Sequence, residues 1–391
     1  MSLISALNWG ETLKGLWEST GIYTAIFAGD GWKNLIMIAV SLVLFYLAIA
    51  KKFEPLLLVP IAFGMLLINI PGAQEQLYNE ETHTGLLYFL SLGVNNVIYP
   101  PLIFLGIGAM TDFGPLIANP KSLLIGGAAQ LGVFLTFAVA ALFLSPAYAG
   151  AVGMIGGADG PTAIYVATML SRIDNDINVG MIAVAAYSYM ALIPIIQPPI
   201  MKLLTTKKER QIRMTQLRKV SKKEKIIFPI AVTLLCGIIL PSAIPLLGML
   251  MLGNLFKECL VTDRLKDTAS NAMMNIITIL LGVCVGAKAK GASFLTLQSL
   301  AVVGGGLVAF MVGTCGGVLM VKFMNLFSKN KMNPLIGSAG VSAVPMAARV
   351  SQKVGQDEVP DNYLLMHAMG PNVAGVIGSS IAAGVLLAIL V

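Results

Sequence analysis

The stretch GGADGPTAIY, from Gly156 to Tyr165, carries a carboxylate in a long uncharged part of the chain. The charged residue that precedes Asp159 is Lys121, and the one that follows it is Arg172. A charged side chain at the centre of a bilayer costs about 2.5–3.5 kcal/mol on insertion scales, so it normally faces a cavity, a cation or a basic partner. No basic residue is near Asp159 in the sequence, which leaves two interpretations: a cation site, or a protonated aspartic acid hydrogen-bonded within a helix bundle.

The residues next to Asp159 favour the cation site. Gly157, Gly160 and Pro161 break a helix. Non-helical backbone at membrane depth is tolerated only where it is buried in protein or lines a wet cavity. The carbonyl groups freed by such a break, together with the hydroxyl of Thr162, are the hard oxygen ligands that Na⁺ requires. We therefore expect a sodium site that uses Asp159, Gly157 and Thr162.

A second glycine-rich and proline-broken stretch, NPLIGSAGVSAVPMAARV, runs from Asn333 to Val350. Arg349 follows 17 uncharged residues in this part of the chain. It is either an arginine that extends to the cytoplasmic surface or a guanidinium that binds a carboxylate through two parallel hydrogen bonds. Asn333 can equally cap the incoming half-helix or ligate a cation through its amide oxygen.

Three further polar residues lie inside apolar runs. Tyr187 and Tyr189, in AAYSYM, lie within a span and not at its edge, so each is either a packed tyrosine or part of a site. His367 is either a hydrogen-bonded bundle histidine or a proton relay. Asn372, in GPN, marks another helix break.

The composition indicates whether these residues lie in a membrane protein or in a soluble one. The chain has 391 residues, of which 57% are hydrophobic and 12% charged, with a mean hydropathy of +0.82. This apolar surface is more than a soluble core could bury, so we expect an integral membrane protein. A spanning helix needs about 20 mostly apolar residues, and the runs are continuous, which favours helices over barrel strands. Uncharged runs of that scale occur at 34–50, 55–74, 84–111, 122–158, 178–201, 226–256, 268–287, 291–321 and 362–391.

These runs predict an all-α polytopic membrane protein with about ten transmembrane helices and two broken or re-entrant segments. We expect one membrane domain over 1–391 without a separate soluble domain. Residues 1–33 lack the pattern of a cleaved signal and read as a retained interfacial segment. The four cysteines form no CxxC pair, so neither a disulfide framework nor a transition-metal site is expected. No GxxxxGK[ST] phosphate loop is present, which argues against direct use of ATP.

Most of the net charge of +7 lies in one loop, residues 202–225, with ten Lys or Arg against Glu209 and Glu224. The positive-inside rule places this loop in the cytoplasm, and we prefer that interpretation to nucleic-acid binding. Counting passes from the basic residues then requires one segment that enters the membrane and turns back. The segment that contains Asp159 is the best candidate.

The two halves of the chain predict inverted repeats. The first half, 34–201, contains the broken segment 148–171, and the second half, 226–391, contains the broken segment 332–350. A shift of 180 residues aligns Gly157 with Gly337 and Gly160 with Gly340. In an inverted-repeat transporter the site lies between two discontinuous helices near the midplane.

Four stretches together resemble the β subunit of the sodium-pumping biotin-dependent decarboxylases, which act on oxaloacetate, methylmalonyl-CoA, glutaconyl-CoA or malonate. The resemblance covers the chain from about residue 30 onward. It implies a subunit of the cytoplasmic (inner) membrane that decarboxylates carboxybiotin with uptake of a proton and exports Na⁺. The four stretches are GGADGPTAIYVATMLS, AAYSYMALIPIIQPPIMKLLTT, NPLIGSAGVSAVPMAARV and LLMHAMGPNVAGVIGS.

The resemblance also implies roles for single residues. Asp159 matches the acid that couples Na⁺ to a proton. Asn333, Gly337 and Ser342 match the second motif, where polar groups fit sodium ligation. Arg349, with Ser342, fits the capture of the carboxylate of carboxybiotin. For the functional tyrosine of the family both Tyr187 and Tyr189 are available, and we favour Tyr189 because it lies closer to the proline-rich break.

The resemblance implies partners as well. This chain has no AMKM-type biotinyl-lysine site, so biotin must arrive on another subunit. The expected partners are a carboxyltransferase α subunit, a biotin carrier subunit and a small membrane γ or δ subunit, and the chain itself is expected to form a homo-oligomer. The alternative function is a secondary Na⁺-coupled transporter of organic anions, because inverted repeats and a midplane carboxylate also occur in such transporters.

Overall fold

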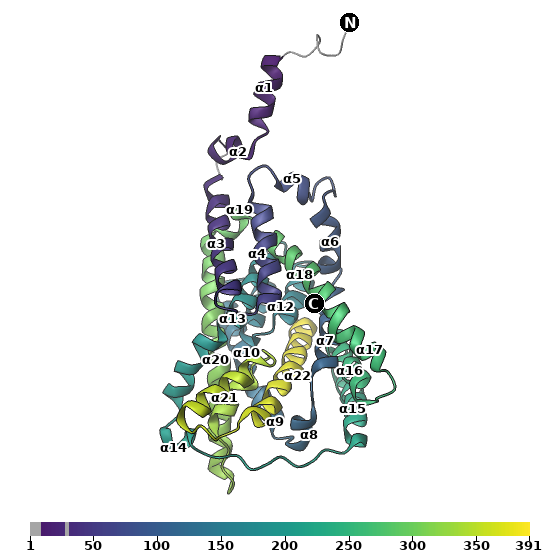
Figure 1. The fold of residues 1–391 in the computed structure, drawn as a ribbon, viewed down its shortest axis with the longest axis vertical. Coiled ribbons are helices and arrows are strands. Elements are labelled where there is room, and N and C mark those ends of the chain that lie inside the picture. The colour runs from purple at the N-terminus through teal and green to yellow at the C-terminus, as the bar shows by residue number, and fades with distance from the viewer. Residues whose placement is uncertain (1–8, 28–30) are drawn as a thin grey trace. The chain divides into compact units, whose positions relative to one another are not determined.

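The computed structural model describes residues 9–27 and 31–391, in which the regular elements are helices (Figure 1). Within these ranges the β structure is confined to one isolated bridge between Asn79 and Thr84. The prediction of an all-α protein is therefore confirmed. The predicted interfacial segment 1–33 lies partly outside the described residues. Its described part forms the short helices α1 (Trp9–Glu18) and α2 (Gly21–Phe27) and the first residues of α3 (Gly31–Ile49).

Several helices in the described ranges are long and apolar enough to cross a membrane, which confirms a polytopic membrane protein. There are six of them, or seven if α6 (Leu86–Asn95) and α7 (Tyr99–Met110), bent by 68°, form one span. The expected number of about ten is not confirmed. The six stretches are Gly31–Ile49, Ser122–Ala140, Val179–Leu204, Asp263–Ala287, Ser299–Phe327 and Leu365–Leu390.

The difference in number comes from the runs 55–74 and 226–256. The first forms α4, Pro55–Asn69, which has only 15 residues. The second is divided at Pro241 into α15 (Lys222–Ile239), which begins with four charged residues, and α16 (Ile244–Glu258). Proline cannot donate the backbone hydrogen bond of a helix interior, and at Pro241 the helical run is interrupted, whereas α13 (Val179–Leu204) and α22 (Leu365–Leu390) continue through their internal prolines.

The described chain separates into two compact units. The first comprises the described residues through 93 together with 279–300. In this unit α4 lies so close to the chain around Val283 that a Cβ atom on Gly64 would come within 2.1 Å of the Val283 carbonyl oxygen. The end of α4 is fixed by Asn69, whose amide donates to the Ala289 carbonyl and accepts from the Gly291 N–H, at 2.8 and 2.9 Å.

The second unit comprises 94–278 and 301–391 and contains both predicted broken segments. The C-terminal helix α22 (Leu365–Leu390; yellow in Figure 1) packs against several elements of this unit. Its partners include α9 (Ser122–Ala129), α12 (Gly160–Leu170), α21 (Met346–Glu358) and the 3₁₀ segment η5 (Pro334–Gly340).

Glycines let the span Ser122–Ala140, formed by α9 and α10 (Leu131–Ala140), cross closely over α20 (Leu297–Phe327). A Cβ atom on Gly132 of α10 would lie 2.7 Å from the Ala309 carbonyl oxygen of α20. In return, a Cβ atom on Gly313 would lie 2.9 Å from the Ala129 carbonyl oxygen. Small residues at such crossings allow the backbones to approach in a membrane protein. Each helix thus places a glycine against the backbone of the other. Gly132 and Gly313 are separated by about 180 residues, which is the offset of the predicted inverted repeat. The inverted repeat stays a prediction.

The predicted basic loop is an ordered connection in the structure. After α13 (Val179–Leu204) and the short helix α14 (Lys207–Arg210), residues 211–221 run without helix to the start of α15. We call residues 211–221 the strap. Carbonyl groups at its start accept hydrogen bonds from amides of distant segments: Ile212 accepts from Asn333 at 2.9 Å and from Asn362 at 3.1 Å. The strap is thus fixed through its backbone.

Two arginines near the start of the strap form ion pairs in different surroundings. Arg210 pairs with Glu358 at 2.8 Å, and the two side chains are 8% and 17% exposed. Arg213 pairs with Asp361 at 2.9 Å, with side chains that are 68% and 63% exposed. Breaking a buried pair leaves an uncompensated charge, whereas an exposed pair is solvated when its partner is lost.

We predict that Arg210→Gln lowers the stability of the purified protein by about 3 kcal/mol or more, and that Arg213→Gln lowers it by about 1 kcal/mol or less. The measurement is the shift of the thermal unfolding midpoint in detergent, with the two variants compared under identical conditions. Equal shifts for the two variants would show that burial does not distinguish these ion pairs.

Candidate functional site

The two predicted broken segments meet in the structure. In the first, α11 (Pro146–Gly153) continues into a short 3₁₀ turn, Met154–Gly157, and the chain then reverses at Ala158, which has φ 53° and ψ 42°. In the second, η5 is followed by an irregular stretch that leads to α21. The backbone N–H of Ser342, in this irregular stretch, donates to the Gly157 carbonyl at 3.1 Å. A direct backbone hydrogen bond therefore joins the two breaks.

Asp159 lies at this junction as the N-cap of α12. One carboxylate oxygen accepts from the Thr162 N–H at 3.2 Å, and the other accepts from the Ser379 hydroxyl of α22 at 2.6 Å. The residue is 4% exposed, and no Lys, Arg or His in the described ranges forms an ion pair with it. The partial positive charge of the helix N-terminus favours an anion at this position, but two hydrogen bonds and a helix end are modest compensation for a buried charge.

Oxygen atoms without hydrogen bonds lie on the residues around Asp159. Thr162 Oγ1, Gln130 Oε1 and the Tyr187 hydroxyl are buried and have no hydrogen-bond partner among the described residues. A Cβ atom on Gly157 would be 3.6 Å from Gln130 Oε1, and one on Gly160 would be 2.5 Å from the Tyr187 Cζ atom that carries the hydroxyl. Gln130 and Tyr187 therefore both face the broken backbone beside Asp159. Native proteins rarely leave buried polar atoms unpaired, so this set of oxygens fits a bound cation.

Helix α22 forms the third side of the junction. Asn372 donates through its amide nitrogen to the carbonyl groups of Ala339 and Val341 in the second break, both at 2.9 Å. The Ser342 hydroxyl donates to the Gly375 carbonyl at 2.8 Å. The two bonds from Asn372 satisfy carbonyl groups of the irregular backbone, and the bond from Ser342 joins this backbone to α22. The amide oxygen of Asn372 has no partner among the described residues, so it is a further candidate ligand.

Two residues predicted as sodium ligands have structural contacts elsewhere. Gly337 packs against α20, where a Cβ atom on it would come within 2.3 Å of the Gly317 carbonyl oxygen. Asn333 is the N-cap of η5: its amide oxygen accepts from the Leu335 N–H at 3.1 Å, and its amide nitrogen donates to the carbonyl groups of Arg210, at the end of α14, and Ile212, in the strap. Of the two interpretations left open for Asn333, the structure shows the cap.

The two candidate tyrosines on α13 point to different neighbours. The ring of Tyr187 packs on Gly160 at the start of α12. The hydroxyl of Tyr189 donates to the Val303 carbonyl of α20 in a short hydrogen bond. Tyr187 therefore lies beside Asp159 in the structure. Tyr189, which we favoured as the functional tyrosine from the sequence, instead has a backbone partner on another helix.

Arg349 is exposed on the first turn of α21. No hydrogen bond or ion pair of its guanidinium occurs within the described residues, and it does not contact Asp159. Its planar group is therefore available to an external carboxylate, for which two parallel hydrogen bonds are the favoured geometry.

Sequence reasoning missed Gln130 and Ser379, and it noted Asn372 only as a helix break. The sequence did contain a signal for Gln130, because it is the one amide side chain in the uncharged run 122–158. Polar side chains inside membrane helices usually face the interior of the bundle. Ser379 is harder to find, because small hydroxyl residues are also common where helices simply pack together.

Comparison with known proteins places the chain in a family. The family described as "Na+-transporting oxaloacetate decarboxylase beta subunit" matches residues 33–390. Methylmalonyl-CoA decarboxylase subunit beta of Propionigenium modestum is 57% identical, over 97% of this chain and 99% of the relative. Glutaconyl-CoA decarboxylase subunit beta of Acidaminococcus fermentans is 56% identical over 93% and 95%, and the oxaloacetate decarboxylase beta chain of Klebsiella pneumoniae is 50% identical over 96% and 98%. The chain therefore belongs to the family of β subunits of Na⁺-transporting decarboxylases.

Proposed function

We propose that this chain decarboxylates carboxybiotin, delivered by a partner subunit, and uses the reaction to export Na⁺ from the cytoplasm. Membership of a family of sodium-transporting decarboxylase subunits favours this pump over the secondary transporter that the sequence left as an alternative. The observation that carries the proposal is the buried carboxylate of Asp159, without a basic partner in the described chain and beside oxygen atoms that lack hydrogen bonds.

Na⁺ is the cargo of the proposed site. Asp159 supplies the negative charge, and Thr162, Gln130, Tyr187 and Asn372 supply neutral oxygens. Four other predicted residues hold the two broken segments in place: Gly157, Ser342, Gly337 and Asn333. The carbonyl oxygen of Gly157 has a second lone pair, so it is still a candidate ligand. A site of one carboxylate and several neutral oxygens suits a monovalent hard cation.

Arg349 is proposed to hold the substrate carboxylate. Carboxybiotin supplies a carboxylate that leaves as CO₂, and this reaction consumes one proton at the biotin nitrogen. The exposed guanidinium of Arg349 can orient the carboxylate before that step, and Ser342 lies in the backbone stretch that leads to α21. No step requires Arg349 to touch Asp159.

Coupling follows from competition between Na⁺ and H⁺ for the same carboxylate. With Na⁺ bound, Asp159 is ionised and the neutral oxygens complete its surroundings. With a proton bound, Asp159 needs no cation, and the Ser379 hydroxyl and the Thr162 N–H remain as hydrogen-bond partners. The two sequence-based interpretations of Asp159 thus become the two states of one transport cycle.

The remaining parts of the proposal concern the assembly. We propose that biotin reaches this chain on a carrier subunit, and that a carboxyltransferase α subunit and a small membrane γ or δ subunit complete the enzyme. The chain forms a homo-oligomer in the cytoplasmic membrane, with the strap on the cytoplasmic side as the positive-inside rule indicates. The names of the relatives as β subunits support a multi-subunit enzyme.

We predict that Asp159→Asn abolishes Na⁺ uptake into inverted vesicles that contain the assembled enzyme. Asparagine keeps the shape but removes the charge that balances the cation. Uptake is started with oxaloacetate, methylmalonyl-CoA or glutaconyl-CoA in turn, with and without avidin. The matched control is Asp176→Asn, which removes a carboxylate from the exposed connection after α12 and should pump normally. Normal pumping by Asp159→Asn would refute the central step, and uptake insensitive to avidin would refute the coupling to biotin.

We predict that Gln130→Leu raises the Na⁺ concentration for half-maximal decarboxylation by about tenfold, which corresponds to ~1.4 kcal/mol, because one neutral ligand is lost. Gln197→Leu is the matched control. Gln197, like Gln130, is buried, donates its amide to a carbonyl group and has an unpaired amide oxygen, but only the oxygen of Gln130 is among the atoms nearest to a Cβ atom on Gly157 beside Asp159. A binding assay of ²²Na⁺ to the purified enzyme separates affinity from turnover. An equal loss of Na⁺ affinity in both variants would show a general packing defect and not a lost ligand.

We predict that Tyr187→Phe changes the pH dependence of Na⁺-stimulated decarboxylation, because the variant loses a hydroxyl beside the carboxylate that exchanges Na⁺ for H⁺. Tyr189→Phe should keep the wild-type pH profile and lose only about 1 kcal/mol of stability, since it removes a hydrogen bond to a backbone carbonyl. The opposite result, with the pH profile altered only in Tyr189→Phe, would return the functional role to Tyr189.

A further inference from the structure

The second unit contains a basic hollow beneath the strap, separate from the junction at Asp159. Its volume is ≈ 1100 Å³. Strap residues 212–218 form one side, the chain around Lys121 at the start of α9 forms another, and the end of α20 with residues 328–332 forms the third. We call this cavity the basic hollow.

The charge of the basic hollow is uncompensated. Its lining contains Lys121, Arg213, Arg218, Lys329 and Lys331, and none of the described residues that line it is Asp or Glu. Arg213 and Arg218 are each paired with an acid outside the lining. No ion pair in the described part of the chain involves the three lysines. Three positive charges thus face one cavity without a partner, which favours an anionic ligand.

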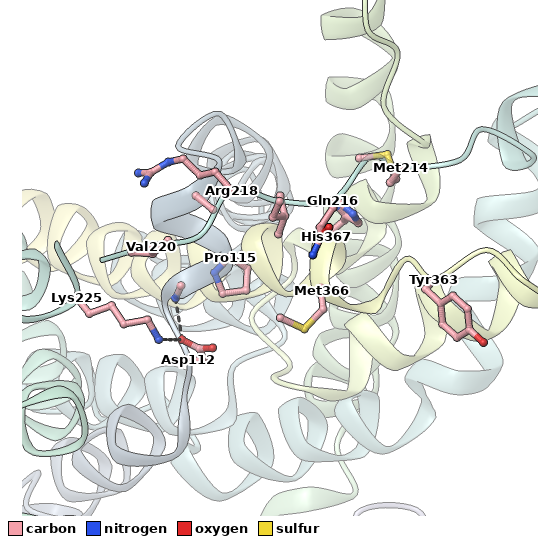
Figure 2. A pocket seen from close by; sticks show the side chains of 13 residues that line it. Asp112, Pro115, Met214, Gln216, Arg218, Val220, Lys225, Tyr363, Met366 and His367 are labelled. Carbon is pink, nitrogen blue, oxygen red and sulfur yellow. Dashed lines mark hydrogen bonds and ion pairs between the residues drawn. The ribbon is translucent and has the colours of Figure 1, made fainter. Parts of the chain in front are cut away.

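An adjoining hollow of ≈ 490 Å³ differs in that an ion pair lies within its lining (Figure 2). It shares the strap residues Met214, Gln216 and Arg218 with the basic hollow and contains Asp112 and Lys225, whose charged atoms are 3.0 Å apart. Partial burial raises the pKa of Asp112, but the Gly114 N–H and the Lys225 ammonium together hold the pKa below its usual value. The charges here are balanced within the protein, so the anion site is the basic hollow alone.

The basic hollow lies where membrane spans end. The spans Ser122–Ala140, Ser299–Phe327 and Leu365–Leu390 all have a terminal turn at its lining, through Leu124, Phe327 and His367. The boundary between hydrocarbon and water therefore passes through this region. On the cytoplasmic side that boundary carries anionic lipid headgroups, which attract basic residues next to the ends of spans.

Large apolar side chains line the same cavity. Leu124 is 56% exposed, Phe323 is 57% exposed and Phe327 is 79% exposed. A small inorganic anion or an acidic protein surface would leave these side chains without a partner. An amphiphile with an anionic headgroup would cover them with its acyl chains.

We propose that the basic hollow binds an anionic phospholipid. Lys121, Lys329 and Lys331 hold the phosphate group, and the acyl chains lie along Leu124, Phe323 and Phe327. Bound in this way, the lipid connects the strap with the ends of α9 and α20.

The test measures binding of acyl-labelled phosphatidylglycerol to the assembled enzyme in neutral detergent, with labelled phosphatidylcholine as the zwitterionic comparison. The hollow variant carries Lys121→Gln, Lys329→Gln and Lys331→Gln together. We expect its affinity for phosphatidylglycerol to fall on the order of 100-fold, because each lysine near an anionic surface contributes about a factor of five. A second variant with arginine at the same three positions keeps the charge and should bind within about threefold of the wild type.

The matched control carries Lys208→Gln, Lys222→Gln and Lys223→Gln, which remove three charges from the same basic loop at exposed positions outside the hollow. It should bind phosphatidylglycerol like the wild type. Three results would overturn the proposal. They are an equal loss of lipid binding in the hollow and control variants, unchanged binding by the hollow variant, and equal binding of the two lipids by the wild type. Full displacement by millimolar inorganic phosphate would identify a site for free anions instead. Loss of the biotin carrier subunit from the hollow variant with lipid binding intact would identify a protein-docking site.

Discussion

The carboxylate of Asp159 is buried without a basic partner in the described chain, and the elements around it can be understood as responses to that charge. A buried carboxylate in a protein interior must be neutralised by a cation or a proton, because hydrogen bonds alone rarely offset its desolvation. The structure supplies a helix N-terminus, the Ser379 hydroxyl and a set of unpaired oxygens at this point. Among the described residues no fixed positive charge lies there, and in the proposed site the compensating charge is a Na⁺ or a proton that enters and leaves. That requirement is what a transport site has to meet.

The same requirement explains why two helices are broken at one place. An intact helix uses its carbonyl groups internally and offers none to a ligand. The breaks at Ala158 and after Gly340 free carbonyl groups, and Asn372 together with the hydrogen bond from Ser342 to Gly157 keeps the irregular backbone satisfied. Glycines at the α10–α20 crossing and at Gly337 let the backbones approach closely enough for these bonds to form. Packing and polar chemistry in this unit therefore depend on one another.

The polar groups of the second unit lie in two separate regions. At the junction, the proposed function leaves the balance of charge to an exchangeable ion. At the ends of the spans, ion pairs such as Arg210 with Glu358 and Lys225 with Asp112 fix the basic loop to the helices. The three lysines of the basic hollow form no ion pair among the described residues, and the proposed lipid headgroup would balance their charge. Backbone hydrogen bonds hold one side of the strap, and the proposed lipid would hold the other. The strap would then stay attached to the helices while Na⁺ and H⁺ exchange at the junction.

The sequence by itself determined the class of the protein, the family and the residues that open the site. A hydrophobic chain of this length must form membrane helices, and Asp159 and the second broken motif stand out because charges and helix breaks are costly inside a bilayer. The expected number of about ten spans is not confirmed, because the run around Pro241 forms two helices that are too short or too charged to count as spans. Only the tertiary structure decided which side chains face Asp159. Tyr187 and Tyr189 are two residues apart on one helix and point to different neighbours, and Asn333 is used as a cap and not at the junction. Gln130 and Ser379 come from helices distant in sequence and reach the site through helix crossings that no local pattern encodes, since the direction of a side chain depends on how each helix is rotated against its neighbours.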